Sequence, residues 1–229
     1  MSNVANTKEY QEKFKSYDKL FNPEFLQNKE ERKLSEKYTI IICEYAGKIN
    51  NLNLRGSQNI LMYNKEVISQ WNSIDNNADF YQIINHSNGK DYLIFRQDLY
   101  GYSVLDLETK EIMQFFPEKS LHGGETFIWT GVNYNPYSNV LAVSGCYWAC
   151  PYSVHLFTFD DPMNPSQKFV DMIECFDGDY DVYDDVDFIR WEERDLRVSR
   201  YIIETNSNEE VLIKEEEYLG WIEEKGQKL

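Results

Sequence analysis

Short runs of β-branched and aromatic residues follow one another at close intervals along most of the chain, and this pattern constrains the fold more than any other feature. Such runs are typical of strands, and the Asn-Pro, Asn-Gly and Asp-Gly pairs between them are typical of turns. No regular alternation with helical segments appears, which disfavours a doubly wound parallel sheet. The expected strands are residues 38–45, 91–97, 101–107, 111–116, 125–133, 140–145, 152–160, 168–175, 187–192, 196–204 and 211–215.

We therefore predict a mainly β fold, an antiparallel meander with propeller-like blades. A weak internal repeat supports this expectation, because an apolar run that ends in aspartate recurs at residues 102–106 and 155–160. About 190 residues follow the N-terminal segment, enough for four or five blades at the usual ~40–45 residues each, and four is near the minimum that closes a ring. A β-sandwich of the same strands is the alternative.

Residues 1–37 are rich in Lys, Glu and Gln and are predicted to be a helical segment attached to an all-β domain of residues 38–229. The polar residue Asn22 before Pro23 is typical of a helix start and predicts a second helix that runs through Leu34. The apolar stripe of the first helix is expected to dock on the protein's own sheet. This stripe consists of Tyr10, Phe14, Tyr17 and Phe21.

The charge of the chain limits its partners. With 39 acidic and 23 basic residues, the formal net charge is -16, which repels nucleic acid phosphates and anionic membrane surfaces and attracts basic proteins. We therefore expect a basic protein partner and no binding to nucleic acid or membranes. The alternative is that the acidity serves solubility alone.

The sequence carries no sign of export or membrane insertion. Residues 1–30 hold no apolar core of a signal peptide, and no stretch approaches the roughly 18 uninterrupted apolar residues of a spanning helix. A cytoplasmic location is therefore expected. The four cysteines lie in apolar or aromatic stretches, which fits buried, reduced thiols. They are Cys43, Cys146, Cys150 and Cys175.

Two thiols and two large aromatic residues crowd into residues 145–152, where one predicted strand gives way to the next. These four residues are Cys146, Tyr147, Trp148 and Cys150. The segment resembles uncharacterised bacterial proteins that share a Gly-Cys-Tyr-Trp-Ala-Cys-Pro signature, and the resemblance extends over about residues 125–196. It implies common descent and a propeller-like β region, but the family has no established activity.

The pair of Cys146 and Cys150 has three interpretations. Buried structural thiols are favoured over a disulfide or half of a metal site, because cytosolic zinc sites usually offer two such pairs or closely spaced histidines. The histidines of this chain, His86, His122 and His155, are scattered instead. His155 lies in a predicted strand between aromatic residues and is expected to be a hydrogen-bonded core histidine.

A run of aspartates interleaved with tyrosines, residues 177–187, is the second candidate site. Runs of one charge are most often solvated or partner-facing, and tyrosine is enriched at protein interfaces. A weaker alternative is a Ca²⁺ or Mg²⁺ site with Asp177, Asp179 and Asp181 as ligands, although the order of an EF-hand loop is not met. The predicted partner-binding residues are Asp179, Tyr180, Asp181, Tyr183, Asp184 and Asp185.

Motifs of common enzyme classes are absent from the sequence. It contains no Gly-x-Ser-x-Gly, P-loop, dinucleotide fingerprint or His-Glu-x-x-His, so no catalytic residue is predicted. The leading hypothesis is an acidic protein-binding module, with a bacterial immunity or inhibitory protein for a basic partner as its most concrete form. The alternatives are a cation-dependent enzyme or sensor that uses residues 177–187 and a structural subunit of a larger assembly.

Overall fold

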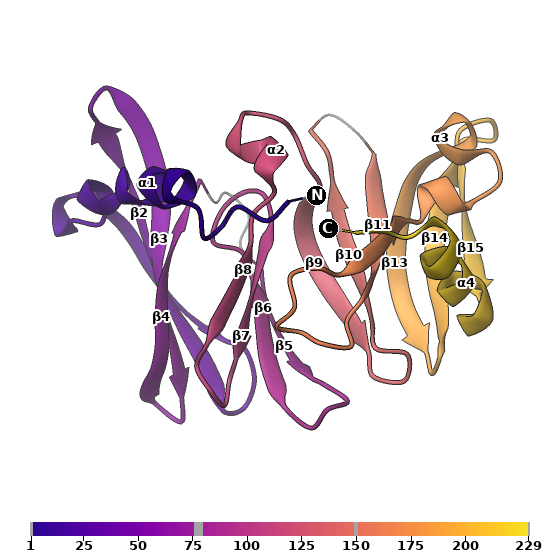
Figure 1. Ribbon diagram of the computed structural model, residues 1–229, viewed down its shortest axis with the longest axis horizontal. Coiled ribbons are helices and arrows are strands. Elements are labelled where there is room, and N and C mark those ends of the chain that lie inside the picture. Colours follow the sequence, from indigo (N-terminus) through magenta and orange to yellow (C-terminus); the bar gives the residue numbers. More distant parts are fainter. Residues whose placement is uncertain (1, 76–79, 149–150, 229) are drawn as a thin grey trace.

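The computed structural model describes residues 2–75, 80–148 and 151–228, which form four antiparallel sheets arranged in a row (Figure 1). Within sheets I and II, each strand pairs with the next one in the sequence. Sheet I contains β1 (Leu26–Lys33), β2 (Tyr38–Ile49), β3 (Leu52–Tyr63) and β4 (Glu66–Ile74). Sheet II contains β5 (Tyr81–Asn85), β6 (Asp91–Phe95), β7 (Tyr102–Asp106) and β8 (Ile112–Phe115).

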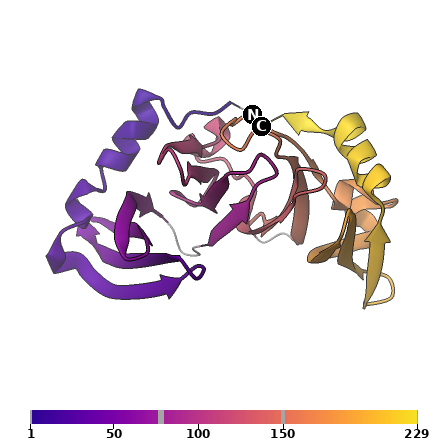
Figure 2. The ribbon, with the colours of Figure 1, turned by 90° about the horizontal axis from the view of Figure 1, so that it is seen from below.

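Sheets III and IV continue the row. Figure 2 shows sheets I and IV at its opposite ends, so the four sheets form an open arc. Sheet III contains β9 (Ile128–Asn135), β10 (Val140–Cys146), β11 (Tyr152–Thr158) and β12 (Lys168–Asp171), with β16 (Gln227–Lys228) at its outer edge. Sheet IV contains β13 (Tyr183–Glu192), β14 (Asp195–Ile202) and β15 (Ser207–Ile213).

The helices are short and lie around the sheets. Among the described residues, no helix combines the length and the apolar character needed to cross a membrane. The α-helices are α1 (Lys8–Lys15), α2 (Glu118–Leu121), α3 (Asp179–Val182) and α4 (Glu215–Lys225). The 3-10 helices are η1 (Asp18–Leu20), η2 (Pro23–Phe25) and η3 (Ile173–Cys175).

The hydrophobic core consists of layers between successive sheets. In β6, Leu93 and Phe95 pack in the layer between sheets I and II, whereas Ile94 packs in the layer between sheets II and III. Because both faces of the inner sheets are buried, their strands read as continuous apolar runs in the sequence. The predicted mainly β, antiparallel meander is thus confirmed, and the stacking of sheets face to face also suits the sandwich alternative.

The N-terminal segment is only partly helical. Helix α1 is confirmed, and the Thr7 side chain caps it by accepting a hydrogen bond from the Tyr10 amide. The predicted second helix is wrong, because Pro23 begins a single 3-10 turn and the chain then enters β1. Strand β1 pairs with β2, so the ladder of hydrogen bonds outweighs the favourable helical propensity of its Lys, Glu and Gln residues.

Helix α1 docks on sheet II through a buried carboxylate. Asp98 is 2% exposed, and its Oδ2 atom lies 2.6 Å from Nζ of Lys13 and accepts a hydrogen bond from the Tyr10 hydroxyl. Burial raises the pKa of Asp98 to about 6, although the charge of Lys13 opposes this shift. The folded protein therefore holds a proton on Asp98 at pH values where the unfolded chain has lost it.

This shift makes the docking of α1 sensitive to pH. Because the folded pKa lies above the ordinary value, the contribution of Asp98 to stability rises as the pH falls from about 7 to about 4, by on the order of 2 kcal/mol. An Asp98→Asn variant lacks this contribution. We expect the difference in unfolding free energy, wild type minus variant, to grow by that amount over this range in denaturant titrations. Parallel pH profiles of the two proteins would contradict it.

Candidate functional site

The acidic residues 177–187 do not form one loop. They divide into a turn at Asp177 and Gly178, helix α3, and the first half of β13. Gly178 is required in the turn, because its φ is 96° and a Cβ atom there would lie 2.3 Å from Cγ2 of Val182. After this turn the aspartates face solvent. Asp177, Asp179, Asp181 and Asp184 are exposed, and Asp185 is half-buried.

The two tyrosines of this segment have different surroundings. Tyr180 is 39% exposed, and its hydroxyl donates a hydrogen bond to Oδ2 of Asp171 at 2.6 Å. Tyr183 is buried, packs edge to face against Phe176, and lies beneath the Arg200 guanidinium at 4.7 Å. Tyr180 therefore belongs to the surface, whereas Tyr183, predicted as a binding residue, is a core residue that anchors β13.

Asp171, the last residue of β12, connects the acidic segment to sheet III. Its buried carboxylate accepts hydrogen bonds from Ser153 Oγ at 2.5 Å, Tyr180 at 2.6 Å and the Ile173 amide at 3.0 Å. Nε2 of His155 lies 3.2 Å from Oδ2 but out of line for a hydrogen bond. Burial raises the pKa of Asp171, but its contacts with His155, Ser153 and Tyr180 outweigh burial and hold the pKa below its usual value. A charged Asp171 thus fixes Tyr180 in place.

The Cys-Tyr-Trp segment lies at the end of β10. Cys146 is half-buried and pairs in register with Tyr152 of β11. Tyr147 packs edge to face against Phe127, with ring centroids 5.5 Å apart. Cys150 lies outside the described residues, so the predicted role of this thiol pair stays a prediction.

The structure brings the two sequence-predicted segments together. Oδ1 of Asp185 accepts a hydrogen bond of 2.7 Å from the Tyr152 amide, which ties β13 to the start of β11. Trp148 is 58% exposed, and its indole N–H donates to the hydroxyl of Tyr100 at 3.0 Å. We call the resulting surface the acidic edge. It comprises the carboxylates of Asp177, Asp179, Asp181, Asp184 and Asp185 and the rings of Tyr152 and Tyr180.

The carboxylates of the acidic edge have no paired cation among the residues that the structure describes. Within the described ranges, none of the five forms an ion pair with a lysine, an arginine or a histidine. Burial and the neighbouring charge of Asp185 raise the pKa of Asp187, and burial with the charges of Asp171 and Asp179 raises that of Glu174. The surface therefore carries uncompensated negative charge.

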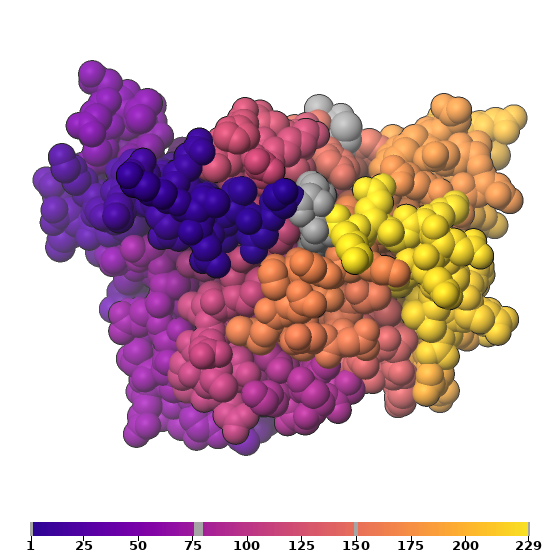
Figure 3. Space-filling view, viewed as in Figure 1, coloured from indigo at the N-terminus to yellow at the C-terminus, as the bar shows by residue number. Residues whose placement is uncertain are grey.

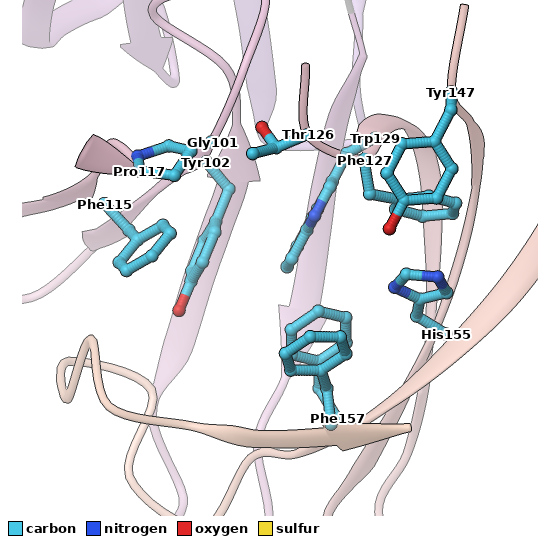
Figure 4. Close-up of a pocket in the computed structure, with 11 residues that line it drawn as sticks. Gly101, Tyr102, Phe115, Pro117, Thr126, Phe127, Trp129, Tyr147, His155 and Phe157 are labelled. Carbon is cyan, nitrogen blue, oxygen red and sulfur yellow. The ribbon is translucent and has the colours of Figure 1, made fainter. Parts of the chain in front are cut away.

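A small aromatic cavity lies behind this surface, between sheets II and III (Figure 4). His155 is 1% exposed, and its ring stacks on Phe127 with centroids 3.6 Å apart. The predicted core position is confirmed, but among the described residues the Nε2 atom has no hydrogen-bond partner. Figure 4 shows Tyr147 and His155 on one side and Tyr102 on the other. The cavity has a volume of about 30 Å³, which suffices for one or two water molecules.

A metal site finds no support among the described residues. No group of three or more His, Cys, Asp or Glu side chains within them is arranged to hold a metal ion. The proposed ligands Asp177, Asp179 and Asp181 are all exposed, and the Cys43 and Cys175 thiols are free. Binding of Ca²⁺ or Mg²⁺ thus stays a prediction.

Sequence reasoning missed the residues that position the acidic edge. Asp171 and Ser153 are 18 residues apart, and Asp171 is not part of the acidic run that drew attention. The alternation of His155 with aromatic residues was the available signal that this strand faces a core. No protein-family model, curated protein or solved structure matches the chain, so the resemblance to the signature family stays a prediction.

Removal of the Asp171 charge tests its anchoring role. We expect Asp171→Asn to lower the free energy of unfolding by about 2–4 kcal/mol, because buried donors on Ser153 and Tyr180 lose a charged acceptor. The matched control Asp184→Asn removes an exposed charge and should change stability by less than about 0.5 kcal/mol. Denaturant titrations of both variants provide the measurement, and equal effects would disprove the role.

Proposed function

We propose that the protein is an acidic protein-binding module that holds a basic protein on its acidic edge. The observation that carries this proposal is the pairing of exposed aromatic rings with carboxylates that lack a cation in the described chain. Tyr152 and Tyr180 are 52% and 39% exposed. Large aromatic residues supply the buried area of binding hot spots, and complementary charge accelerates association.

The rigidity of the acidic edge supports the same function. The hydrogen bonds of Tyr180 to Asp171 and of Asp185 to the Tyr152 amide hold both side chains in place before a partner arrives. A pre-ordered surface loses less conformational entropy on binding, which strengthens affinity. The repulsion between neighbouring carboxylates, which contributes to the raised pKa values of Asp187 and Glu174, would be relieved by a lysine or arginine of the partner.

Affinity capture from cells that express the protein naturally tests the proposal. The full chain is immobilised, and retained proteins are identified by mass spectrometry at low and at high salt. We expect a stoichiometric basic protein whose retention falls as salt screens the charges. A triple variant, Asp179→Asn with Asp181→Asn and Asp184→Asn, should weaken its binding about tenfold, since each exposed pair contributes about 0.5 kcal/mol.

A control variant that loses the same number of negative charges elsewhere distinguishes binding at the acidic edge from attraction by the net charge of the chain. Glu24→Gln, Glu31→Gln and Glu66→Gln remove three exposed carboxylates in sheet I and the turn before it. The control should retain the partner almost as well as the wild type does. Equal losses in both triple variants would assign binding to net charge alone and would refute a specific site on the acidic edge.

A further inference from the structure

A second surface, independent of the acidic edge, lies between sheets I and II. It is a groove of about 580 Å³ along the outer edge of β8, with β4 on its other side. In Figure 3 the N-terminal residues, sheet II and the loop before β12 meet on this face of the molecule. Among the residues that the structure describes, no charged side chain lines the groove, although 27% of the residues in the chain are charged. Six carboxamide side chains line it instead: Asn3, Asn6, Gln70, Asn72, Gln97 and Gln114.

The backbone of β8 presents hydrogen-bonding groups to this groove. Strand β8 is the last strand of sheet II and pairs with β7 on one side. The amide of Asp106 donates to the carbonyl of Glu111, which makes residues 106 and 111 a hydrogen-bonded position of the hairpin, while the carbonyl of Asp106 accepts from the Lys110 amide. In an antiparallel ladder, residues whose peptide groups bond to the neighbouring strand alternate with residues whose peptide groups point away from it. The peptide groups of Ile112 and Gln114 consequently point away from β7.

The N-terminal residues already use this edge in the manner of an added strand. The side-chain amide of Asn3 donates to the carbonyl of Gln114 at 3.0 Å, and its Oδ1 accepts from the amide of Phe116 at 3.0 Å. One carboxamide thus takes the place of a backbone peptide group. The Val4 amide continues the pattern by donating to the carbonyl of Phe116 at 2.9 Å. Within the described part of the chain, no further backbone hydrogen bond reaches this edge at Ile112.

On the opposite side of the groove, Gln97 forms hydrogen bonds to the backbone at the edge of β4. The carbonyl of Gln97 accepts a hydrogen bond from the Ile74 amide at 2.8 Å, and the side-chain amide of Gln97 donates to the carbonyl of Asn72 at 3.4 Å. Residues 72 and 74 therefore face outward, and by alternation so does Gln70, which lines the groove. Two strand edges and six carboxamides line one uncharged channel.

We propose that this groove binds an extended, uncharged polypeptide segment of a partner protein, which adds to β8 as an outer strand. Carboxamides both donate and accept hydrogen bonds and so match the peptide groups of a strand. Natural edge strands are usually blocked by charged side chains or proline, but β8 has the sequence Ile-Met-Gln-Phe and carries neither. Main-chain hydrogen bonds along the edge supply affinity, and the absence of charge in the groove selects a neutral segment.

Nuclear magnetic resonance tests the proposal on the full chain. The probe is a short peptide of alternating threonine and valine, blocked at both ends, which is uncharged and prefers extended conformations. We expect saturable shifts of the backbone amide signals of Ile112 and Gln114. In the control peptide, every second backbone nitrogen is methylated, namely those on the side that would face β8. This peptide cannot donate hydrogen bonds to the edge, so we expect it to produce no shift.

Two variants locate the binding. Ile112→Lys places a charge on the edge of β8, where Ile112 is 36% exposed, and should weaken the peptide at least about tenfold. Leu52→Lys, at a 63% exposed position on β3, should leave binding unchanged. The proposal is overturned if the peptide gives no saturable shift, if the methylated peptide binds equally well, or if a neutral oligosaccharide shifts the same amides while the peptide does not.

Discussion

The stacking of consecutive antiparallel sheets face to face is the constraint on which the rest of this molecule depends. Each inner sheet must be apolar on both faces, and large rings fill the space between sheets II and III. Tyr102 and Trp129 stack across this layer with ring centroids 4.2 Å apart and almost parallel planes. The faces of the inner sheets are mostly occupied by packing, with buried polar side chains such as Ser103 and His155 among the apolar ones, so the exposed binding groups of these sheets lie at strand ends, turns and sheet edges. Both candidate binding surfaces lie in such places.

Asp171 shows how one buried charge connects the packed interior to the surface. Its carboxylate accepts hydrogen bonds from β11, from the start of η3 and from α3, so three separate elements share one acceptor. A buried carboxylate is costly unless its partners satisfy it, and here several do. The consequence is that Tyr180 and the aspartates around it are held on a rigid support. An interaction surface of this kind is prepared before its partner is present.

The sequence predicted the elements whose pattern is local and missed those determined by distant contacts. Strands β6, β7, β10 and β11 were predicted because burial on both faces produces unbroken apolar runs. The polar segment of β1 was predicted as helix, because its pairing with β2 cannot be read from its own residues. Strands β3 and β4 and helix α4 carry many polar residues and gave no clear signal. Wherever a polar segment is ordered mainly by its neighbours, its conformation follows from the fold and not from its composition.

The same distinction applies to the acidic edge. The aspartate run and the Cys-Tyr-Trp segment stood out by composition, and the structure joins them through Asp185 and the amide of Tyr152. Tyr183 could not be separated from Tyr180 by sequence, since only the left-handed turn at Gly178 and the short helix α3 decide which ring faces the core. Asp171 lies outside the run and was not predicted, because its role depends on donors from other elements, Ser153 of β11 and Tyr180 of α3.

Site-specific photo-crosslinking in the native cells tests most directly whether the acidic edge binds a basic protein. A photoreactive phenylalanine replaces Tyr152 on the acidic edge, and in a second protein it replaces Tyr137, which is 59% exposed in the turn at the opposite end of β10. We expect a covalent adduct with one basic protein from position 152 and none from position 137. The same adduct from both positions, or no adduct from position 152, would contradict the proposed function.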